Sequence, residues 1–154
     1  MAVITVTVKG ENIDKTWDEL KDSIKHQMAS RGYRASNELR NAALEVLRGQ
    51  RSGRIYRVPG TKATYQASAP GEPPAVRTGT FRLGWKPQSM VENGGNRVVS
   101  KIRNETTTQG GGYKLAEILE KGTPGGQMAP RPHHEKIQQK ALPDIVNIYS
   151  QPYV

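Results

Sequence analysis

The sequence of 154 residues contains no cysteine, a single phenylalanine and no long apolar run. The absence of cysteine excludes disulfides, thiolate zinc sites and thiol nucleophiles. No apolar stretch approaches the roughly 20 residues that cross a bilayer, and the first nine residues lack the basic head and long apolar core of a signal peptide. Because only 34% of the residues are hydrophobic, the core must be small and a large buried active-site pocket is not expected.

The length fits a single domain, residues 1–154, in a soluble protein of the cell interior or of a virion. Its 23 Lys and Arg residues against 14 Asp and Glu give a net charge of +9. Residues 31–103 hold 14 of these cations against four acidic residues, whereas the segments on either side are close to neutral. A concentrated basic segment favours contact with phosphates or with an acidic protein surface, although a solvated basic loop fits the charge equally well.

Hydrophobic periodicity predicts the first two elements. Residues 2–8 (AVITVTV) alternate and are rich in β-branched side chains, as in a strand. From Ile13 to Leu47 apolar residues recur at spacings of three and four, which is typical of a helix. Such a helix is about 50 Å long, so part of it should pack against a sheet or against another copy of the protein. Gly32 within it is either a kink or a tolerated glycine.

The middle of the chain loses this periodicity. Residues 49–80 are rich in glycine and proline, so this segment is expected to form a long extended loop with no regular element. Residues 81–86 and 98–105 then read as two strands around the turn signal Asn93–Asn96, which predicts a β-hairpin.

The C-terminal third predicts two helices. A short one covers residues 113–119 and is stopped by Gly122, and a second covers residues 137–149 with a kink or restart at Pro143. The order of elements predicts an α+β fold in which the long N-terminal helix and the C-terminal helix pack against a small, mostly antiparallel sheet.

The long loop opens with basic residues interleaved with tyrosines. The candidate interaction residues are Arg48, Arg51, Arg54, Tyr56, Arg57 and Lys62. Charge and stacking would let this segment grip a nucleic-acid backbone, but it carries no recognisable DNA- or RNA-binding signature. Docking on an acidic protein neighbour is the somewhat favoured interpretation.

Candidate metal ligands are few. His133 and His134 with Glu135 form the most tempting cluster. Adjacent residues of a helix point about 100° apart, so two neighbouring histidines do not share a face as residues at i and i+4 would. We therefore interpret both as surface or interface histidines and expect no metal site.

Candidate catalytic groups are equally sparse. Glu105, Glu117, Glu120 and Asp144 are interpreted as helix-surface charges or ion-pair partners. The stretch Lys121–Thr123 looks like the end of a phosphate loop, but it follows a helical pattern rather than a strand. We expect neither an enzyme nor a cofactor.

Two stretches together are similar to a known family. The first, residues 70–82, is a proline-rich lead into an R-T-G-x-[LF]-R signature, and the second, residues 113–132, contains a Leu-Glu-x-Gly-Thr core and an Arg-Pro pair. Their order, after a long helix and before a C-terminal helix, resembles the neck proteins of long-tailed bacteriophages, also called head–tail connector, tail-completion or head–tail joining proteins. The motif residues are Arg77, Thr78, Gly79, Phe81, Arg82, Leu119, Glu120, Gly122, Thr123, Arg131 and Pro132.

The resemblance implies a virion structural protein that is present in the host cytoplasm during assembly. It would form a homo-oligomeric ring at the head–tail junction, around the DNA channel. Its partners would be connector or stopper proteins on the head side and tail-terminator or tail-tube proteins on the tail side, with genomic DNA in the channel as a further candidate. The alternative is a basic nucleic-acid-binding module that acts through the Arg-rich loop.

The motif residues have plausible structural roles. Gly79 would supply an unusual backbone angle, with Thr78 capping the turn. Gly122 would end the short helix in a left-handed conformation. Arg131 and Pro132 would begin the last helix, with the proline in its first turn. The family usually carries an aromatic residue just after the Arg-Pro pair, where this chain has His133.

Overall fold

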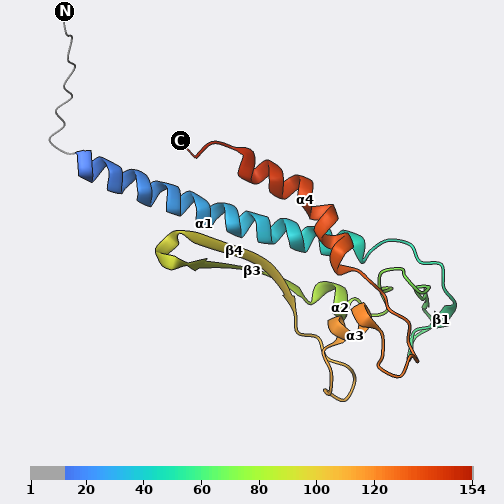
Figure 1. Cartoon of the computed structure of the whole chain (residues 1–154). Helices are drawn as coiled ribbons and strands as arrows, with labels where there is room; N and C mark the ends of the chain where they lie inside the picture. The colour runs from blue at the N-terminus through green and yellow to red at the C-terminus, as the bar shows by residue number, and fades with distance from the viewer. Residues whose placement is uncertain (1–12, 154) are drawn as a thin grey trace, which may run out of the picture.

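The computed structural model describes residues 13–153 and has a mixed α+β architecture (Figure 1). The long helix α1 (Ile13–Val46) packs against the hairpin of strands β3 (Trp85–Glu92) and β4 (Arg97–Asn104), and also against the C-terminal helix α4 (His134–Ser150). The strand predicted over residues 2–8 lies outside the described residues. Within the described part, no helix has the length and apolar character needed to span a membrane.

Helix α1 is continuous, which confirms the predicted long helix. Its second half packs into the molecule through buried side chains such as Ala35, Ala42 and Ala43, and Leu47 just after its end is also buried. Most side chains between residues 15 and 23 are exposed, including Trp17 at 57%. The first turns of α1 project beyond the tip of the β3–β4 hairpin (Figure 1).

Gly32 is the point where α1 comes closest to the sheet, and it does not interrupt the helix. A Cβ atom added there would lie 2.2 Å from Val98 Cγ1 and 2.9 Å from Ser89 Oγ. The Gly32 carbonyl also accepts a hydrogen bond from Ser100 Oγ at 2.7 Å. The missing side chain therefore permits the contact between helix and sheet.

Replacing Gly32 with alanine is expected to lower the free energy of unfolding by about 1–3 kcal/mol, because the new methyl group overpacks the contact with Val98. In an exposed helix the same change would stabilise by about 1 kcal/mol. Ser30→Ala, on an exposed face of the same helix, is the matched control and should change stability by only a few tenths. Urea unfolding measures both, and a stabilised Gly32→Ala variant would contradict the close packing.

The core is small, as the composition predicted. It is built largely from alanines where α1 and α4 meet, together with one large aromatic residue, Trp85, at the start of β3. Its buried members are Ala42, Ala43, Leu47, Trp85, Ala116, Ile137 and Ala141. Small side chains allow the two helices to approach closely, but they bury little apolar area.

The segment 49–80 contains a regular element, so the prediction of an irregular loop is wrong there. Strands β1 (Ile55–Arg57) and β2 (Thr64–Gln66) pair in antiparallel fashion with Tyr56 opposite Tyr65. A turn closes this hairpin through hydrogen bonds from the Val58 N–H to the Ala63 carbonyl and from the Thr61 N–H to the Val58 carbonyl. Each strand has three residues, too short to show an alternating pattern. The described residues therefore contain two separate two-stranded sheets.

The strand predicted over residues 81–86 begins four residues later than expected. Helix α2 (Thr80–Leu83) forms a single turn, and β3 starts only at Trp85. Gly79 precedes the helix with φ 84°, which confirms its predicted role, and its carbonyl accepts the Leu83 N–H at 2.9 Å. This turn leaves Leu83 59% exposed, whereas strand alternation would have placed it on the same face as Phe81. The return strand and the turn at residues 93–96 agree with the prediction.

The two predicted C-terminal helices are present as α3 (Leu115–Lys121) and α4. Helix α4 continues through Pro143. The prediction that Arg131 and Pro132 begin this helix is wrong, because α4 starts at His134. His133 has a non-helical backbone with φ −142°, and the Arg131 N–H donates to the Leu119 carbonyl at 2.7 Å, which holds this segment against α3.

The far end of α4 is fixed to α1 by a buried arginine. Arg31 is 6% exposed and donates to the carbonyl oxygens of Gln151 and Pro152 at 2.6 and 2.7 Å. Its guanidinium also lies 3.9 Å from the centre of the Tyr153 ring. These bonds satisfy carbonyls after the end of the helix, so α4 is anchored to α1 near its C-terminus.

Candidate functional site

Two features stand out as candidates for function. One is the basic hairpin, residues 53–67, which contains β1 and β2. The other is the α3–α4 clamp, made of Glu120, Gly122, Arg131, His133 and His134, which joins the end of α3 to the start of α4. The sequence indicated the first region by its basic residues and tyrosines, and the second by its motif residues and its two histidines.

The basic hairpin presents aromatic and basic groups together. The rings of Tyr56 and Tyr65 stack with centres 6.0 Å apart, as expected for residues directly opposite in the register. The Arg54 guanidinium lies 5.6 Å from the centre of the Tyr56 ring. Arg54 and both tyrosines therefore share one face of the ribbon, while Ile55 and Arg57 are on the other.

The cations of this region face solvent. Arg48, Arg54, Arg57 and Lys62 are exposed, and none of them takes part in the ion pairs found among the described residues. The sequence from residue 48 to residue 71 contains no Asp or Glu. With no acidic neighbour in the segment to neutralise it, this surface favours an anionic partner.

Arg51 is placed differently from the other predicted interaction residues. Its guanidinium turns back into the chain and donates to the carbonyl oxygens of Val46 at 2.9 Å and Pro74 at 3.0 Å. Burial lowers the pKa of Arg51, although Glu72 opposes that shift. Arg51 thus caps the C-terminal end of α1 and ties it to the segment after the basic hairpin.

Glu72 completes this attachment. Its carboxylate accepts hydrogen bonds from the Ser52 hydroxyl, from the Ala69 N–H at 2.8 Å and from the Ser52 N–H at 3.0 Å. These bonds, the Ser52 hydroxyl first, lower the pKa of Glu72 to about 2. The two ends of the basic hairpin are therefore held together by one ionised side chain.

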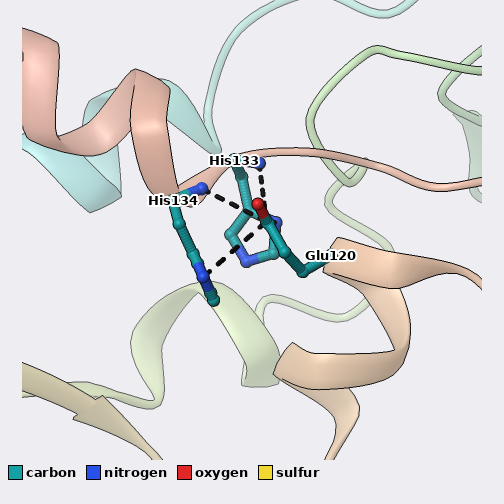
Figure 2. Close-up of side chains that lie close together, drawn as sticks. All are labelled: Glu120, His133 and His134. Atoms are coloured by element: carbon teal, nitrogen blue, oxygen red, sulfur yellow. Dashed lines mark hydrogen bonds and ion pairs between the residues drawn. The ribbon is translucent and has the colours of Figure 1, made fainter.

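The α3–α4 clamp centres on Glu120 (Figure 2). Its Oε2 accepts hydrogen bonds from the backbone N–H groups of His133 at 2.9 Å and His134 at 3.2 Å. These are N–H groups at the first turn of α4, which has no side-chain cap of its own. A carboxylate from α3 thus caps α4 across a gap of 13 residues, at the end where a helix dipole favours negative charge.

His133 is completely buried, so its interpretation as a surface or interface residue is wrong. Its ring makes edge contacts with Phe81 and Trp85, at centre distances of 5.7 and 6.0 Å. Its Nδ1 lies 2.9 Å from both Glu120 Oε2 and the Arg131 carbonyl oxygen. Because both neighbours are acceptors, Nδ1 carries the hydrogen. In the sequence, His133 follows the Arg131–Pro132 pair, where the motif resemblance leads one to expect an aromatic residue.

Opposing effects set the protonation of the clamp. Burial alone would raise the pKa of Glu120, but the N–H groups of His133 and His134 and the two nearby imidazoles lower it below its ordinary value of 4.5. Burial lowers the pKa of His133 below 6.5, helped by His134 and opposed by the Arg131 carbonyl and Glu120. A neutral His133 beside an ionised Glu120 is the form that the fold favours.

Among the described residues, Glu120, His133 and His134 form the group whose ligand atoms lie close enough together to surround a metal ion. One atom each from Glu120, His133 and His134 lies within 4.8 Å of the others. However, His133 Nδ1 must donate to the Arg131 carbonyl, and Glu120 Oε2 already receives two N–H groups. These bonds use the same atoms to cap α4, whereas His133 Nε2 is buried without a hydrogen-bond partner.

Gly122 allows the clamp to close. Helix α3 ends there as predicted, but with φ 79° and ψ 177° rather than a left-handed helical conformation. A Cβ atom would lie 2.6 Å from the Met128 carbonyl oxygen. Thr123 fixes the following loop, since its N–H donates to Met128 O and its hydroxyl accepts the Met128 N–H.

The structure brings most of the motif residues together. In the first stretch, Arg82 Nε donates to the Leu44 carbonyl at the end of α1, and Thr78 Oγ1 accepts the Thr80 N–H at 3.4 Å. Arg77 is exposed. Sequence reasoning missed Asn104, whose side-chain amide donates to the Phe81 carbonyl at 2.7 Å. The family position of His133 was the one signal that would have indicated its burial.

Comparison with known protein families, curated proteins and solved structures identifies no significant match to this chain. The candidate site therefore rests on its own geometry and on the motif resemblance.

Proposed function

We propose that this chain is a structural subunit of the neck of a long-tailed bacteriophage. Copies of it would form a ring at the head–tail junction, around the DNA channel, and join or complete the tail. Connector or stopper proteins would bind on the head side and tail-terminator or tail-tube proteins on the tail side.

The observation that carries this proposal is the meeting of the two motif stretches. Phe81 of the first stretch packs against His133, which directly follows the second. The Gly71 N–H of the first donates to the Pro130 carbonyl of the second at 3.2 Å. Residues that are far apart in the chain thus form one structural unit, as expected if the family signature preserves a scaffold.

Exposed apolar groups also support an assembled state. On α4, Leu142 and Val146 are 57% and 56% exposed, and Tyr149 follows on the same face at 40%. Trp17 on the projecting part of α1 is also exposed. A small protein with a sparse core and such groups at its surface is well suited to bury them against neighbours.

The basic hairpin would make the charged contact of the junction. Reversing Arg54, Arg57 and Lys62 to Glu in the phage that encodes this chain is expected to leave complete heads and tails unjoined. Like charges facing each other across an interface cost several kcal/mol, so we expect the titre to fall at least about 100-fold. Electron microscopy of lysates and plaque titration measure the two effects.

The matched control reverses three exposed cations elsewhere, Lys15, Arg34 and Lys121, and should preserve joining. Equal infectivity of the hairpin variant and the parent phage would contradict the role of the basic hairpin. Particle imaging that places this chain outside the neck would contradict the proposed function itself.

One observation favours a second candidate function, a nucleic-acid-binding module. The two stacked tyrosines beside Arg54 match the pairing of aromatic and basic groups that holds single strands. Binding of the isolated protein to DNA that weakens steeply with salt would favour this candidate. Assembly into rings without such binding would favour the neck protein.

A further inference from the structure

Strand β4 has an open edge. In the described residues β3 and β4 pair only with each other. Pro87 lies opposite Ile102, and since proline has no N–H, this pair cannot be a hydrogen-bonded one. The N–H and carbonyl of Ile102 therefore point away from β3, toward the open edge of β4. Because the pairs alternate along the strand, the same holds for Val98 and Ser100.

The two edges of this sheet differ. On β3, Pro87 takes away one donor from the outer edge, which blocks addition of a further strand there. Strand β4 contains no proline and is eight residues long. If another strand adds to this sheet, it adds to β4.

A groove runs beside the open edge of β4. It has a volume of about 430 Å³ and lies between β4, helix α3 and the start of α4. Leu39, Ile102 and Ile137 contribute apolar side chains to its lining, whereas Lys101 and Arg103 contribute charged ones. Val98 and Ser100 alternate with these two residues and lie on the face of the sheet that contacts α1 at Gly32. A strand placed here would need an apolar face toward α1 and a face that tolerates water on the other side.

Residues 2–8 have this pattern. Ile4, Val6 and Val8 form one face of the predicted strand, and the other contains Thr5 and Thr7. The segment carries no charged side chain, so it adds none to the basic edge of β4.

The same chain cannot place this segment there without unwinding α1. The tip of the β3–β4 hairpin lies at Lys25, which a Cβ atom on Gly95 would touch, about 18 Å along the helix from Ile13. Crossing to the neighbouring layer adds roughly 10 Å sideways, so the path is about 21 Å even to the tip. Extended backbone from Val8 to Ile13 covers at most about 18 Å.

We propose that residues 2–8 of one copy add as a third strand to the open edge of β4 in a neighbouring copy. Ile4, Val6 and Val8 then face the groove floor, and the threonines lie on the side of Lys101 and Arg103. Each copy gives one strand and receives one, so the contact is head-to-tail and can close into a ring. The inference rests on the proposed ring, and it names the contact that links its subunits.

The absence of cysteine allows a direct test by disulfide cross-linking of full-length chains. Thr5→Cys in one chain is mixed with Val99→Cys, Lys101→Cys or Arg103→Cys in another. Cross-strand neighbours on one face bring Cβ atoms within about 5.5 Å, so at least one of these mixtures should form a disulfide-linked dimer on mild oxidation. The matched control is Gln88→Cys, on the same face but on β3 opposite Lys101, and it should cross-link at least about tenfold less.

A second variant separates strand pairing from chance collision. Val6→Pro in the Thr5→Cys chain removes a donor and stiffens the backbone, so the yield of the cross-link should fall at least about tenfold. Val6→Thr, which keeps strand propensity, should retain it. Equal yields from β3 and β4 positions, no cross-link at any β4 position, or a cross-link only within one chain carrying both cysteines would each overturn the proposal.

The outcome is independent of the test of function. If imaging places the chain at the neck but no cross-link to β4 forms, strand exchange is wrong and the neck assignment stands. If the cross-links form but the chain is absent from the neck, the reverse holds.

Discussion

Replacing Gly122 with alanine is expected to destabilise the protein by about 3 kcal/mol or more. The backbone at this position has φ 79° and ψ 177°, a region that is essentially restricted to glycine. The new Cβ would also lie 2.6 Å from the Met128 carbonyl oxygen and 3.1 Å from the Pro130 nitrogen. Both are backbone atoms of the loop that leads to the clamp, so neither can move aside alone.

The measurement is equilibrium unfolding in urea, with Gly125→Ala as the matched control. Gly125 lies in the same loop, and the nearest atom to a Cβ there is a flexible Gln127 side-chain carbon at 3.9 Å. This variant should stay within about 0.5 kcal/mol of the parent. If the two variants lost the same stability, the close approach of the chain at Gly122 would not be important.

Replacing Glu120 with glutamine is expected to cost about 2 kcal/mol at neutral pH. The carboxylate receives the N–H groups of His133 and His134 and lies beside His133 Nδ1. Hydrogen bonds to a charged acceptor contribute about 1.5–3 kcal/mol, and a neutral amide keeps only part of this. It also removes the negative charge from the N-terminus of α4.

The pH dependence gives this prediction a specific signature. The pKa of Glu120 in the folded state lies below 4.5, so its stabilisation is complete above pH 4.5 and is lost as the pH falls through the folded-state pKa. The difference in free energy of unfolding between parent and Glu120→Gln should therefore shrink as the pH falls below about 4.5.

His133 adds a second loss of stability on acidification, which begins at a higher pH than the loss from Glu120. Its pKa in the folded state lies below 6.5, so the unfolded chain binds a proton there first. Stability should begin to fall as the pH drops below about 6.5 in the parent, and more steeply in the Glu120→Gln variant, because Glu120 raises the pKa of His133.

The control for Glu120 is Glu117→Gln, an exposed carboxylate one turn earlier on α3. It should change stability by less than about 0.5 kcal/mol. A Glu120→Gln variant as stable as this control, or a difference that does not shrink below about pH 4.5, would show that Glu120 does not cap α4.

The clamp and the basic hairpin are expected to have different roles, one in stability and one in assembly. The clamp joins the two motif stretches and orients α4, whereas the basic hairpin is held only at its base, through Glu72 and Arg51, and leaves its cations exposed. Variants of the clamp should thus affect stability, and variants of the basic hairpin should affect assembly without loss of stability.

The sequence predicted the elements that have a long, repeated pattern. The 34 residues of α1 repeat their apolar spacing many times, and the turn at residues 93–96 has the Asn-Gly chemistry of a reversal. Short elements were missed, since three residues at Ile55–Arg57 or four at Thr80–Leu83 hold too few positions to show a period. At α2, hydrogen bonds from Arg82 to the Leu44 carbonyl and from Asn104 to the Phe81 carbonyl hold the turn in place.

The small core, the excess of positive charge between residues 31 and 103 and the two motif stretches were determined by the sequence alone. The tertiary structure decided which of the charged and polar residues are free. It turned Arg51 inward to cap α1 and buried His133 among aromatic rings, while Arg54 and Arg57 stayed in solvent. The reason is that unpaired backbone carbonyls and N–H groups at helix ends must find partners, and which side chain reaches them depends on how the helices pack.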